Sequence, residues 1–362
     1  MSIVPLRPAS EEEAAATQGA EEILRIPAGP HPPITFFDVD GVRHEADPEH
    51  TYPLLGVVLR DATIHFPGVV SLPGGLLLDA NVGYTSVELC DHALPDYPLV
   101  RDPASGAITR RSDAPCAYHC REAAICVAAQ SNFSAWLLGE LPRVVLAARH
   151  VPGIEVILHG DARPFHFDSL ADAGVAADRI RHVPAAGHVK VDRLVWVTPT
   201  YFHQVPHPAG TRELALVERP PEPARRPRIY ASRSSPEVTM RRIVNEPAVE
   251  KLLESRGFTV IRPEALSYHA QKGYAAGAEV FAAPFGAALA SIAFCRERSI
   301  VLHIATKFSF EFIRLAAQRH LQLVQVRTLR RKVREGPNYS ASHEFMIEPA
   351  EMEKALALAG TL

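Results

Sequence analysis

Residues 228–304 have the sequence RIYASRSSPEVTMRRIVNEPAVEKLLESRGFTVIRPEALSYHAQKGYAAGAEVFAAPFGAALASIAFCRERSIVLHI. Short apolar runs alternate there with segments whose apolar side chains recur at helical spacing. Strands that alternate with helices are typical of a parallel sheet covered by helices on both faces. The predicted strands are residues 228–231, 258–261, 279–283, 299–304 and 321–326, and the predicted helices are residues 247–256, 267–276, 287–294, 310–320 and 350–359. The sequence therefore predicts an α/β fold with a doubly wound parallel sheet in its C-terminal part.

The rest of the chain divides at residues 205–228, which hold a cluster of prolines. Proline clusters are typical of linkers, so we expect an N-terminal lobe over residues 49–210 and a C-terminal lobe over residues 211–362. The N-terminal lobe begins with short apolar runs between turn residues over 54–89, which predicts a small antiparallel sheet. Residues 1–48 are acidic and then proline-rich, and we expect them to form a loosely packed arm.

The composition excludes several classes of protein. The chain has 362 residues, 47% of them hydrophobic, and a formal net charge of -3, and this length is enough for two hydrophobic cores. The charge lacks the basic excess of nucleic-acid-binding proteins, so we expect no nucleic acid partner. No apolar stretch approaches the roughly 18 residues of a membrane span, and the N-terminus has no signal-peptide core. The five cysteines form no CxxC pair. These features favour a cytoplasmic protein with reduced thiols.

One helix is clearly predicted in the N-terminal lobe, over residues 132–150, where Pro142 predicts a kink or a break. Asn132 at its start and Glu140 two turns later could place polar groups on the wall of a cleft. The alternative is that Trp136 belongs to the core and that Glu140 lies on the surface.

Two segments at the carboxyl ends of predicted strands could bind an anion. The turn at residues 283–288, APFGAA, joins a strand to a helix, and parallel sheets bind their ligands at such ends. Its small residues would let a phosphate approach the amides of the helix start; alternatively, Gly286 only permits a tight turn. Ser232 and Arg233 directly follow the strand 228–231, so Arg233 should face the same crevice, where its planar guanidinium suits a diphosphate.

The neighbouring polar residues have simpler explanations as well. Of Arg241 and Arg242, we expect one to lie on the solvated surface, and Asn245 could cap the helix that follows. The sequence contains neither GxGxxG nor GxxxxGK[ST], which argues against an ordinary dinucleotide or P-loop site.

We expect no metal site. Asp38 and Asp40 form a DxD pair, but this pair lies in the proline-rich arm rather than after a buried strand. Cys116, His119 and Cys120 lie close together without an evident fourth ligand.

Two stretches resemble the family 61 glycosyltransferases, a group that includes bacterial capsule and exopolysaccharide enzymes. NFSAWLLGELPR, residues 132–143, is similar to the family's N-x-x-H-W-L-x-[DE]-x-L-P-R. Residues 230–294 are similar to its R…R-x-x-N-E…L…G-F…P-E-x-L…Q…A…G-x-H-G-A-x-L-x-N-x-x-F. The order and spacing of these motifs agree over about 65 residues of the second stretch, which makes the resemblance specific.

The resemblance implies a GT-B-like fold of two lobes with a cleft between them. It also implies inverting transfer of a sugar from a nucleotide-sugar donor such as a UDP-sugar to a glycan or lipid-linked acceptor, in surface polysaccharide synthesis and without an obligatory metal. The resemblance implies donor-binding positions at Arg233, Arg242, Asn245, Glu246, Gln271, Gly286 and Ala287. We add Ser232 and Phe285, which adjoin these positions, as predicted donor-binding residues. The resemblance implies motif positions in the N-terminal lobe at Asn132, Trp136 and Arg143. We add His207 as a predicted acceptor-side residue and Glu140 as the candidate base.

The sequence also departs from the family pattern. Phe285 and Ala135 stand where the family has histidine, and Gly139 stands where it has an acidic residue, with Glu140 one place later. These changes leave open a binding or regulatory relative that has lost its catalytic activity. A nicotinamide dehydrogenase on the same type of sheet is a third alternative, although the glycine fingerprint of that class is missing.

Overall fold

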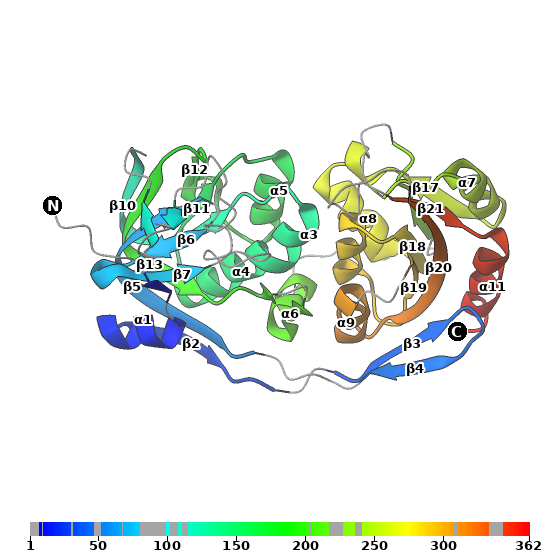
Figure 1. Ribbon diagram of the computed structural model, residues 1–362, viewed down its shortest axis with the longest axis horizontal. Helices are drawn as coiled ribbons and strands as arrows, with labels where there is room; N and C mark the ends of the chain where they lie inside the picture. Colours follow the sequence, from blue (N-terminus) through cyan, green and yellow to red (C-terminus); the bar gives the residue numbers. More distant parts are fainter. Residues whose placement is uncertain are drawn as a thin grey trace. The chain divides into compact units, whose positions relative to one another are not determined.

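The computed structural model describes residues 7–8, 10–29, 32–46, 52–66, 68–79, 99–101, 108–110, 115–202, 205–216, 227–235, 241–306, 310–332 and 343–362. The chain forms two compact units (Figure 1). Unit 1 consists of Met1–Gly29 and Thr51–Glu213, and unit 2 consists of Pro30–His50 and Leu214–Leu362. The chain therefore passes from one unit to the other after residues 29, 50 and 213.

Unit 2 is built on the predicted parallel sheet. Its parallel strands lie in the order β17-β16-β18-β19-β20. They are β16 (Arg228–Ala231), β17 (Phe258–Ile261), β18 (Val280–Pro284), β19 (Ile300–Ala305) and β20 (Gln322–Lys332). The five predicted strands are confirmed, with β20 extending six residues beyond the predicted end at residue 326.

Helices cover both faces of this sheet, as predicted. They are α7 (Glu246–Ser255), α8 (Tyr268–Gly277), α9 (Phe310–Gln318), α11 (Pro349–Ala359) and the short 3-10 turn η4 (Pro263–Ala265). Helices α7 and α11 lie on one face and α8 and α9 on the other (Figure 1). The core of the first face joins Val249 and Leu253 of α7 and Met352 of α11 to the strands. The predicted helix over residues 287–294 forms, but as the 3-10 helix η5 (Ala287–Phe294).

Residues 1–48 do not form the expected arm. Helix α1 (Glu11–Gln18) and strand β2 (Glu21–Ile26) pack on unit 1, whereas β3 (Ile34–Asp38) pairs in parallel with β20 of unit 2 and antiparallel with β4 (Arg43–Ala46). The physical reason is the alternation in β3, which buries Ile34, Phe36 and Asp38 against the sheet. A further strand, β21 (His343–Ile347), pairs antiparallel with β20.

Unit 1 contains the predicted antiparallel sheet and extends it with parallel strands. The antiparallel strands are β5 (Leu54–His65), β6 (Val69–Ser71) and β7 (Leu76–Asp79), and residues 80–89 of the predicted region lie outside the described residues. The parallel strands lie in the order β13-β10-β11-β12. They are β10 (Cys116–Ala128), β11 (Glu155–His159), β12 (Ile180–Val183) and β13 (His188–Val197). Antiparallel pairing of β13 with β5 joins the two halves into one sheet.

The remaining elements of unit 1 are short. They are β1 (Arg7–Pro8), η1 (Pro73–Gly75), α5 (Pro164–Asp172), η3 (Ala177–Arg179), the pair β8 (Leu99–Arg101) and β9 (Ile108–Arg110), and the pair β14 (Tyr201–Phe202) and β15 (Val205–Pro206). The expected linker over residues 205–228 also differs, because helix α6 (Pro208–Leu216) occupies part of it. Proline is well tolerated at the first position of a helix, and residues 217–226 lie outside the described residues.

The predicted helix over residues 132–150 is confirmed, but it contains a π turn. It consists of α3 (Phe133–Ala135), the π segment η2 (Trp136–Glu140) and α4 (Leu141–His150). Pro142 has no N–H to donate four residues back to the carbonyl of Leu138. The hydroxyl of Thr200 lies 2.8 Å from that carbonyl oxygen and 2.9 Å from that of Gly139, so it supplies a donor where the helix loses one.

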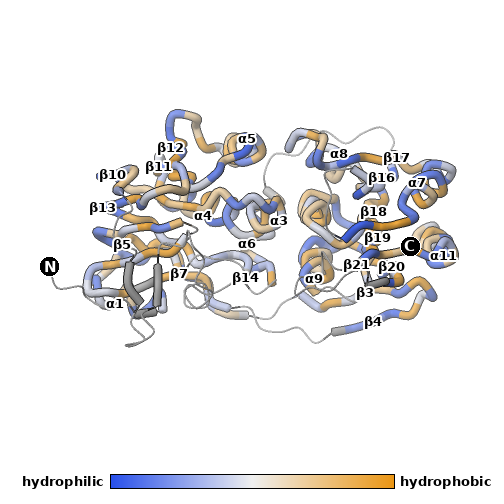
Figure 2. Tube along the Cα trace, turned by 45° about the horizontal axis from the view of Figure 1, so that its top comes forward, coloured by the Kyte–Doolittle hydropathy of each residue, from blue (hydrophilic) through white to orange (hydrophobic). Residues whose placement is uncertain are grey.

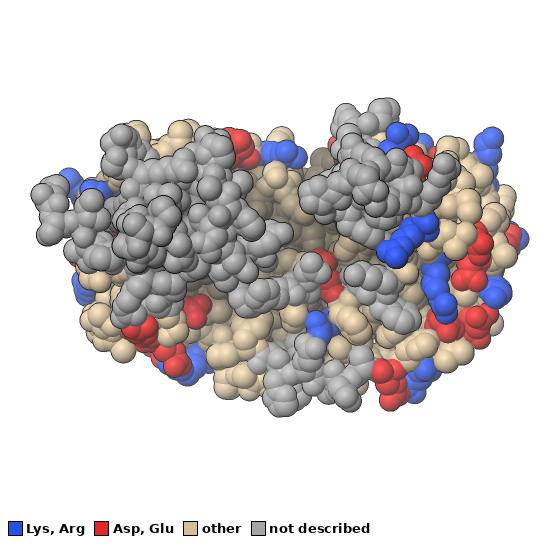
Figure 3. Space-filling view, in the orientation of Figure 1, with Lys and Arg blue, Asp and Glu red and all other residues tan. Residues whose placement is uncertain are grey.

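Charged residues of both signs are interspersed on the face shown in Figure 3. Figure 2 shows hydrophobic and hydrophilic residues alternating along the helices of both units. Within the described ranges, we find no helix that combines the length and the hydrophobicity needed to cross a bilayer.

Candidate functional site

The candidate site lies where the strand order of unit 2 reverses. From β16 the chain continues to β17 on one side, and then crosses to β18 on the other side of β16. The crevice outside the carboxyl ends of two such strands is the usual ligand site of open parallel sheets. Arg233 follows β16, and Phe285 and Gly286 follow β18, so the topology brings the two predicted segments together.

Arg233 and Gly286 are in direct contact. A methyl group built on Gly286 would clash with Nη1 of the Arg233 guanidinium. Gly286 has a φ of 160°, an extended conformation that any residue adopts. The absence of a side chain at Gly286 therefore leaves the space that the guanidinium occupies, whereas the alternative explanation from the sequence was a tight turn.

Glu246 fixes the backbone from which Arg233 projects. Its Oε1 accepts hydrogen bonds from the Arg233 backbone N–H (2.6 Å), the Tyr230 hydroxyl (2.9 Å) and the Ser232 hydroxyl (3.1 Å). Burial raises the pKa of Glu246, and these donors act in the opposite direction. Because Ser232 is also bound to Glu250 on the same helix (2.6 Å), Ser232 and Glu246 tie the end of β16 to α7 and position Arg233.

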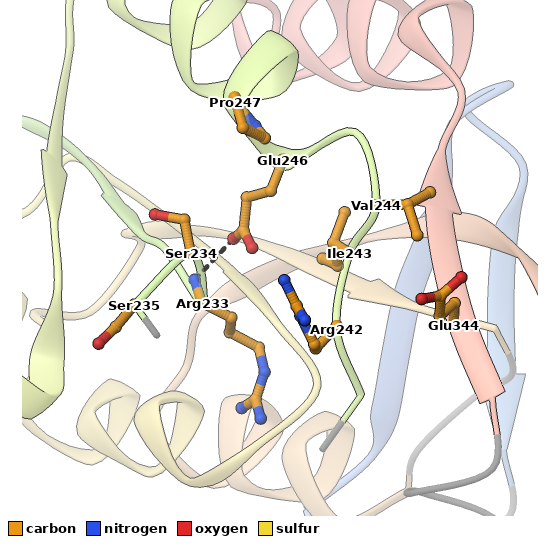
Figure 4. Close-up of a pocket in the computed structure, with 9 residues that line it drawn as sticks. All are labelled: Arg233, Ser234, Ser235, Arg242, Ile243, Val244, Glu246, Pro247 and Glu344. Atoms are coloured by element: carbon orange, nitrogen blue, oxygen red, sulfur yellow. Dashed lines mark hydrogen bonds between the residues drawn. The ribbon is translucent and has the colours of Figure 1, made fainter. Parts of the chain in front are cut away.

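A polar cavity of about 250 Å³ begins at Arg233 (Figure 4). Its lining residues are Arg233, Ser234, Ser235, Arg242, Ile243, Val244, Glu246, Pro247 and Glu344. Figure 4 shows the Glu246 carboxylate directed at the Arg233 nitrogen and the Arg233 guanidinium extending away from Glu246. Two arginines and two glutamates therefore line one small cavity.

The segment from Arg242 to Asn245 is held by β21 rather than by its own helix. The N–H of Phe345 donates to the Arg242 carbonyl (2.9 Å), and the N–H of Val244 donates to the Phe345 carbonyl (2.8 Å). The Asn245 side chain donates to the Ile347 carbonyl (2.6 Å) and accepts from the Ile347 N–H (3.1 Å). Asn245 therefore does not cap α7 with its side chain, which was the alternative that its position suggested.

The two neighbouring arginines point in different directions. Arg242 is exposed at the rim of the cavity. Arg241 has a φ of 56°, and its guanidinium lies 4.8 Å from the centre of the Phe285 ring. From the sequence we expected one of the two arginines on the surface, and we predicted only Arg242 as a donor-binding residue. Local sequence carries no signal that distinguishes Arg241 from Arg242, because the contact with Phe285 depends on the tertiary fold.

Phe285 contacts the site with its ring, because its backbone N–H is bonded within the sheet. Its N–H donates to the Ile304 carbonyl (2.8 Å) and is thereby committed within the sheet, whereas its ring contacts Arg241. Ala287 begins η5 in the same turn. Gln271 lies elsewhere: its amide donates to the carbonyls of Pro263 and Leu266, so it holds the turn before α8.

The structure places Glu140 in the interior of unit 1. Glu140 is 0% exposed and Arg143 is 1% exposed, and Arg143 Nη1 donates to Glu140 Oε2 (2.7 Å). Burial raises the pKa of Glu140, and the Arg143 charge acts in the opposite direction. A general base must reach the acceptor hydroxyl, which an enclosed carboxylate does not, so this geometry favours a structural role for Glu140.

The four acceptor-side residues also differ from the expectation of a shared cleft wall. Asn132 caps the helix by accepting the N–H of Ser134 (2.9 Å). The Trp136 indole is buried, and its N–H donates to the Ser169 hydroxyl (2.8 Å). Arg143 donates to the Val197 carbonyl (2.8 Å) and stacks on Trp196. His207 is buried beside the Tyr52 carbonyl (3.1 Å). Apart from Asn132, these side chains serve the packing of unit 1.

The DxD pair has a structural role. Asp38 Oδ1 accepts the N–H groups of Asp40 and Val42, and Oδ2 lies 3.1 Å from His44. These bonds close the turn between β3 and β4. Across the described ranges, no three His, Cys, Asp or Glu side chains gather in the arrangement of a metal site.

The comparisons with known proteins agree with the resemblance stated above. The model of the family described as Glycosyltransferase 61 matches residues 86–302, which is more than half of the chain. The protein therefore belongs to the glycosyltransferase 61 family, and this membership suggests glycosyltransferase activity. No curated protein matches the chain.

Proposed function

We propose that the protein transfers a sugar from a nucleotide-sugar donor, and that Arg233 binds the donor diphosphate beside the Gly286 turn. The observation that carries this proposal is the contact between the Arg233 guanidinium and Gly286 at the switch point of the unit 2 sheet. A guanidinium at such a crevice offers two parallel donors to phosphate oxygens.

The charge at this position suits the chemistry of the reaction. The bond from the sugar to the diphosphate breaks during transfer, and negative charge develops on the departing phosphate oxygen. Positive groups already held in place stabilise that charge without reorganising. Arg233 is held by Glu246 through its backbone, so no obligatory metal is needed in this proposal.

The cavity next to Arg233 would receive another part of the donor. Its volume of about 250 Å³ is slightly below the range for whole small-molecule sites, roughly 300–1,000 Å³, so it would hold only part of the donor. Arg242 and Glu344 at its lining offer a donor and an acceptor. By the family resemblance, we propose inverting transfer to a hydroxyl of a glycan or lipid-linked acceptor in surface polysaccharide synthesis.

The proposal is tested by calorimetric titration of the purified protein with UDP, GDP, CMP and their sugars. We expect one nucleotide to bind in the micromolar range, and Arg233→Ala to weaken binding at least tenfold, about 1.4 kcal/mol. Arg298→Ala is the matched control, because Arg298 is an exposed arginine of the same unit at the amino end of β19. Equal binding by wild type and Arg233→Ala would contradict the proposal.

A transfer assay with the bound donor then separates an enzyme from its alternative. Release of the nucleoside diphosphate that depends on an added glycan acceptor would support transfer. The enclosed position of Glu140 is the observation that favours the alternative, a relative that binds the donor without turning it over. Donor binding without any release would support that alternative.

A further inference from the structure

A second guanidinium group, that of Arg241, lies beside the proposed phosphate site and contacts Phe285, the residue that precedes Gly286. The Arg241 guanidinium lies over the ring of Phe285 at 4.8 Å from its centre, and the Arg233 guanidinium lies against Gly286. Consecutive Cα atoms are about 3.8 Å apart. The two guanidinium groups therefore contact adjacent residues of one turn, Phe285 and Gly286, although the two arginines come from separate segments of the chain.

This arrangement keeps two positive charges close together in a partly dehydrated place. Burial lowers the pKa of Arg233 and the nearby positive charge of Arg241 lowers it further, against the attraction of Glu246 and Glu264. Burial also lowers the pKa of Arg241, against the attraction of Glu311. Like charges that are held together and dehydrated disfavour each other, and an anion bound between them would remove that repulsion.

The backbone at Arg241 is strained in the conformation that directs the side chain inward. Its φ of 56° lies in the left-handed region, which long side chains rarely adopt. Such strain persists only where the surrounding structure maintains it, and it often marks functional sites. Here the surrounding structure includes β21, which binds the next residues through Phe345 and Ile347.

We propose that Arg241 is a second phosphate-binding residue, which grips the diphosphate together with Arg233 while the Phe285 ring holds its guanidinium flat. The proposal rests on the proposed function, since it names a further residue of the same donor site. A planar guanidinium stacks on an aromatic ring better than an ammonium group does, so the role of Arg241 should not transfer fully to lysine.

The test uses inorganic pyrophosphate as the probe, because it presents the shared anion without a nucleobase. Arg241→Gly and Arg241→Gln should each weaken pyrophosphate binding at least tenfold, and Arg241→Lys should give an intermediate loss. Arg241→Gly should fold at least as well as wild type, because glycine adopts a φ of 56° without strain. Arg298→Gly is the control, because Arg298 also has a positive φ, of 62°, and its variant should bind as wild type does.

A purely structural role for Arg241 would not change the salt dependence of binding. Loss of a cation that contacts the anion should make pyrophosphate affinity less sensitive to ionic strength. Binding within twofold of wild type in a folded Arg241→Gly or Arg241→Gln variant, with Arg233→Ala weakened, would overturn this inference and leave the proposed function intact. Absence of binding of pyrophosphate and of every nucleotide by the wild type would overturn both.

Discussion

At the scale of single residues, position along a strand was more informative than residue type. The position of Arg233 beside the Gly286 turn could be predicted because it closely follows a strand in a parallel sheet, and the carboxyl ends of such strands meet at one edge. Glu140 could not be placed, because a carboxylate on a predicted helix faces the core or the solvent according to packing that local sequence does not encode. In the structure Glu140 faces the core, where Arg143 on the same helix pairs with it and offsets its buried charge.

Replacing Glu140 by Gln should destabilise the protein by about 3 kcal/mol, because it leaves the Arg143 charge buried without its ionic partner. Urea denaturation followed by circular dichroism measures this change. Glu353→Gln is the control, since Glu353 pairs with Arg256 at the surface, and its loss should cost less than about 1 kcal/mol. A Glu140→Gln variant of wild-type stability whose transfer rate falls at least about 100-fold would contradict this account and make Glu140 a catalytic base.

At the scale of elements, the local sequence pattern was sufficient to predict the alternating strands and helices of unit 2. It was not sufficient to predict strands that pair with segments far away in the sequence. The strands β16 to β19 could be predicted within a residue because each is an apolar run between turn residues. β3 and β21 were missed, since both are short strands whose pairing with β20 depends on the tertiary fold. Such pairing matters for the site, because β21 holds the segment that carries Arg241 and Arg242.

The π turn shows how one element accommodates an unfavourable residue. Pro142 correctly predicted a disturbance in the helix, but the helix continues through it as one element. The hydroxyl of Thr200, which follows β13, supplies the missing donor. Since that donor comes from 62 residues away in the sequence, the choice between a break and a π turn could not be read from the helix alone.

At the scale of the whole molecule, the two units are interleaved in sequence. Unit 2 includes Pro30–His50 as well as Leu214–Leu362, so a cut at the expected boundary near residue 211 removes β3 and β4 from its sheet. An edge strand that loses its partner exposes unpaired backbone groups and tends to aggregate.

A fragment of residues 214–362 should therefore aggregate or fold poorly. The same fragment with residues 30–50 joined ahead of it by a Gly/Ser linker should be monomeric and should unfold cooperatively. Size-exclusion chromatography and thermal denaturation of the two fragments measure the difference. If both fragments were monomeric with the same melting temperature, β3 would contribute nothing to unit 2.

The space left by Gly286 is occupied by the Arg233 guanidinium, and we propose that this group binds the donor diphosphate. The most direct measurement is calorimetric titration of wild type and Gly286→Ala with the nucleoside diphosphate that binds the wild type. The added methyl group must displace the guanidinium, so we predict at least tenfold weaker binding. The melting temperature should change by less than about 2 °C, because the backbone at Gly286 is extended. Equal affinity of the two proteins would contradict the account.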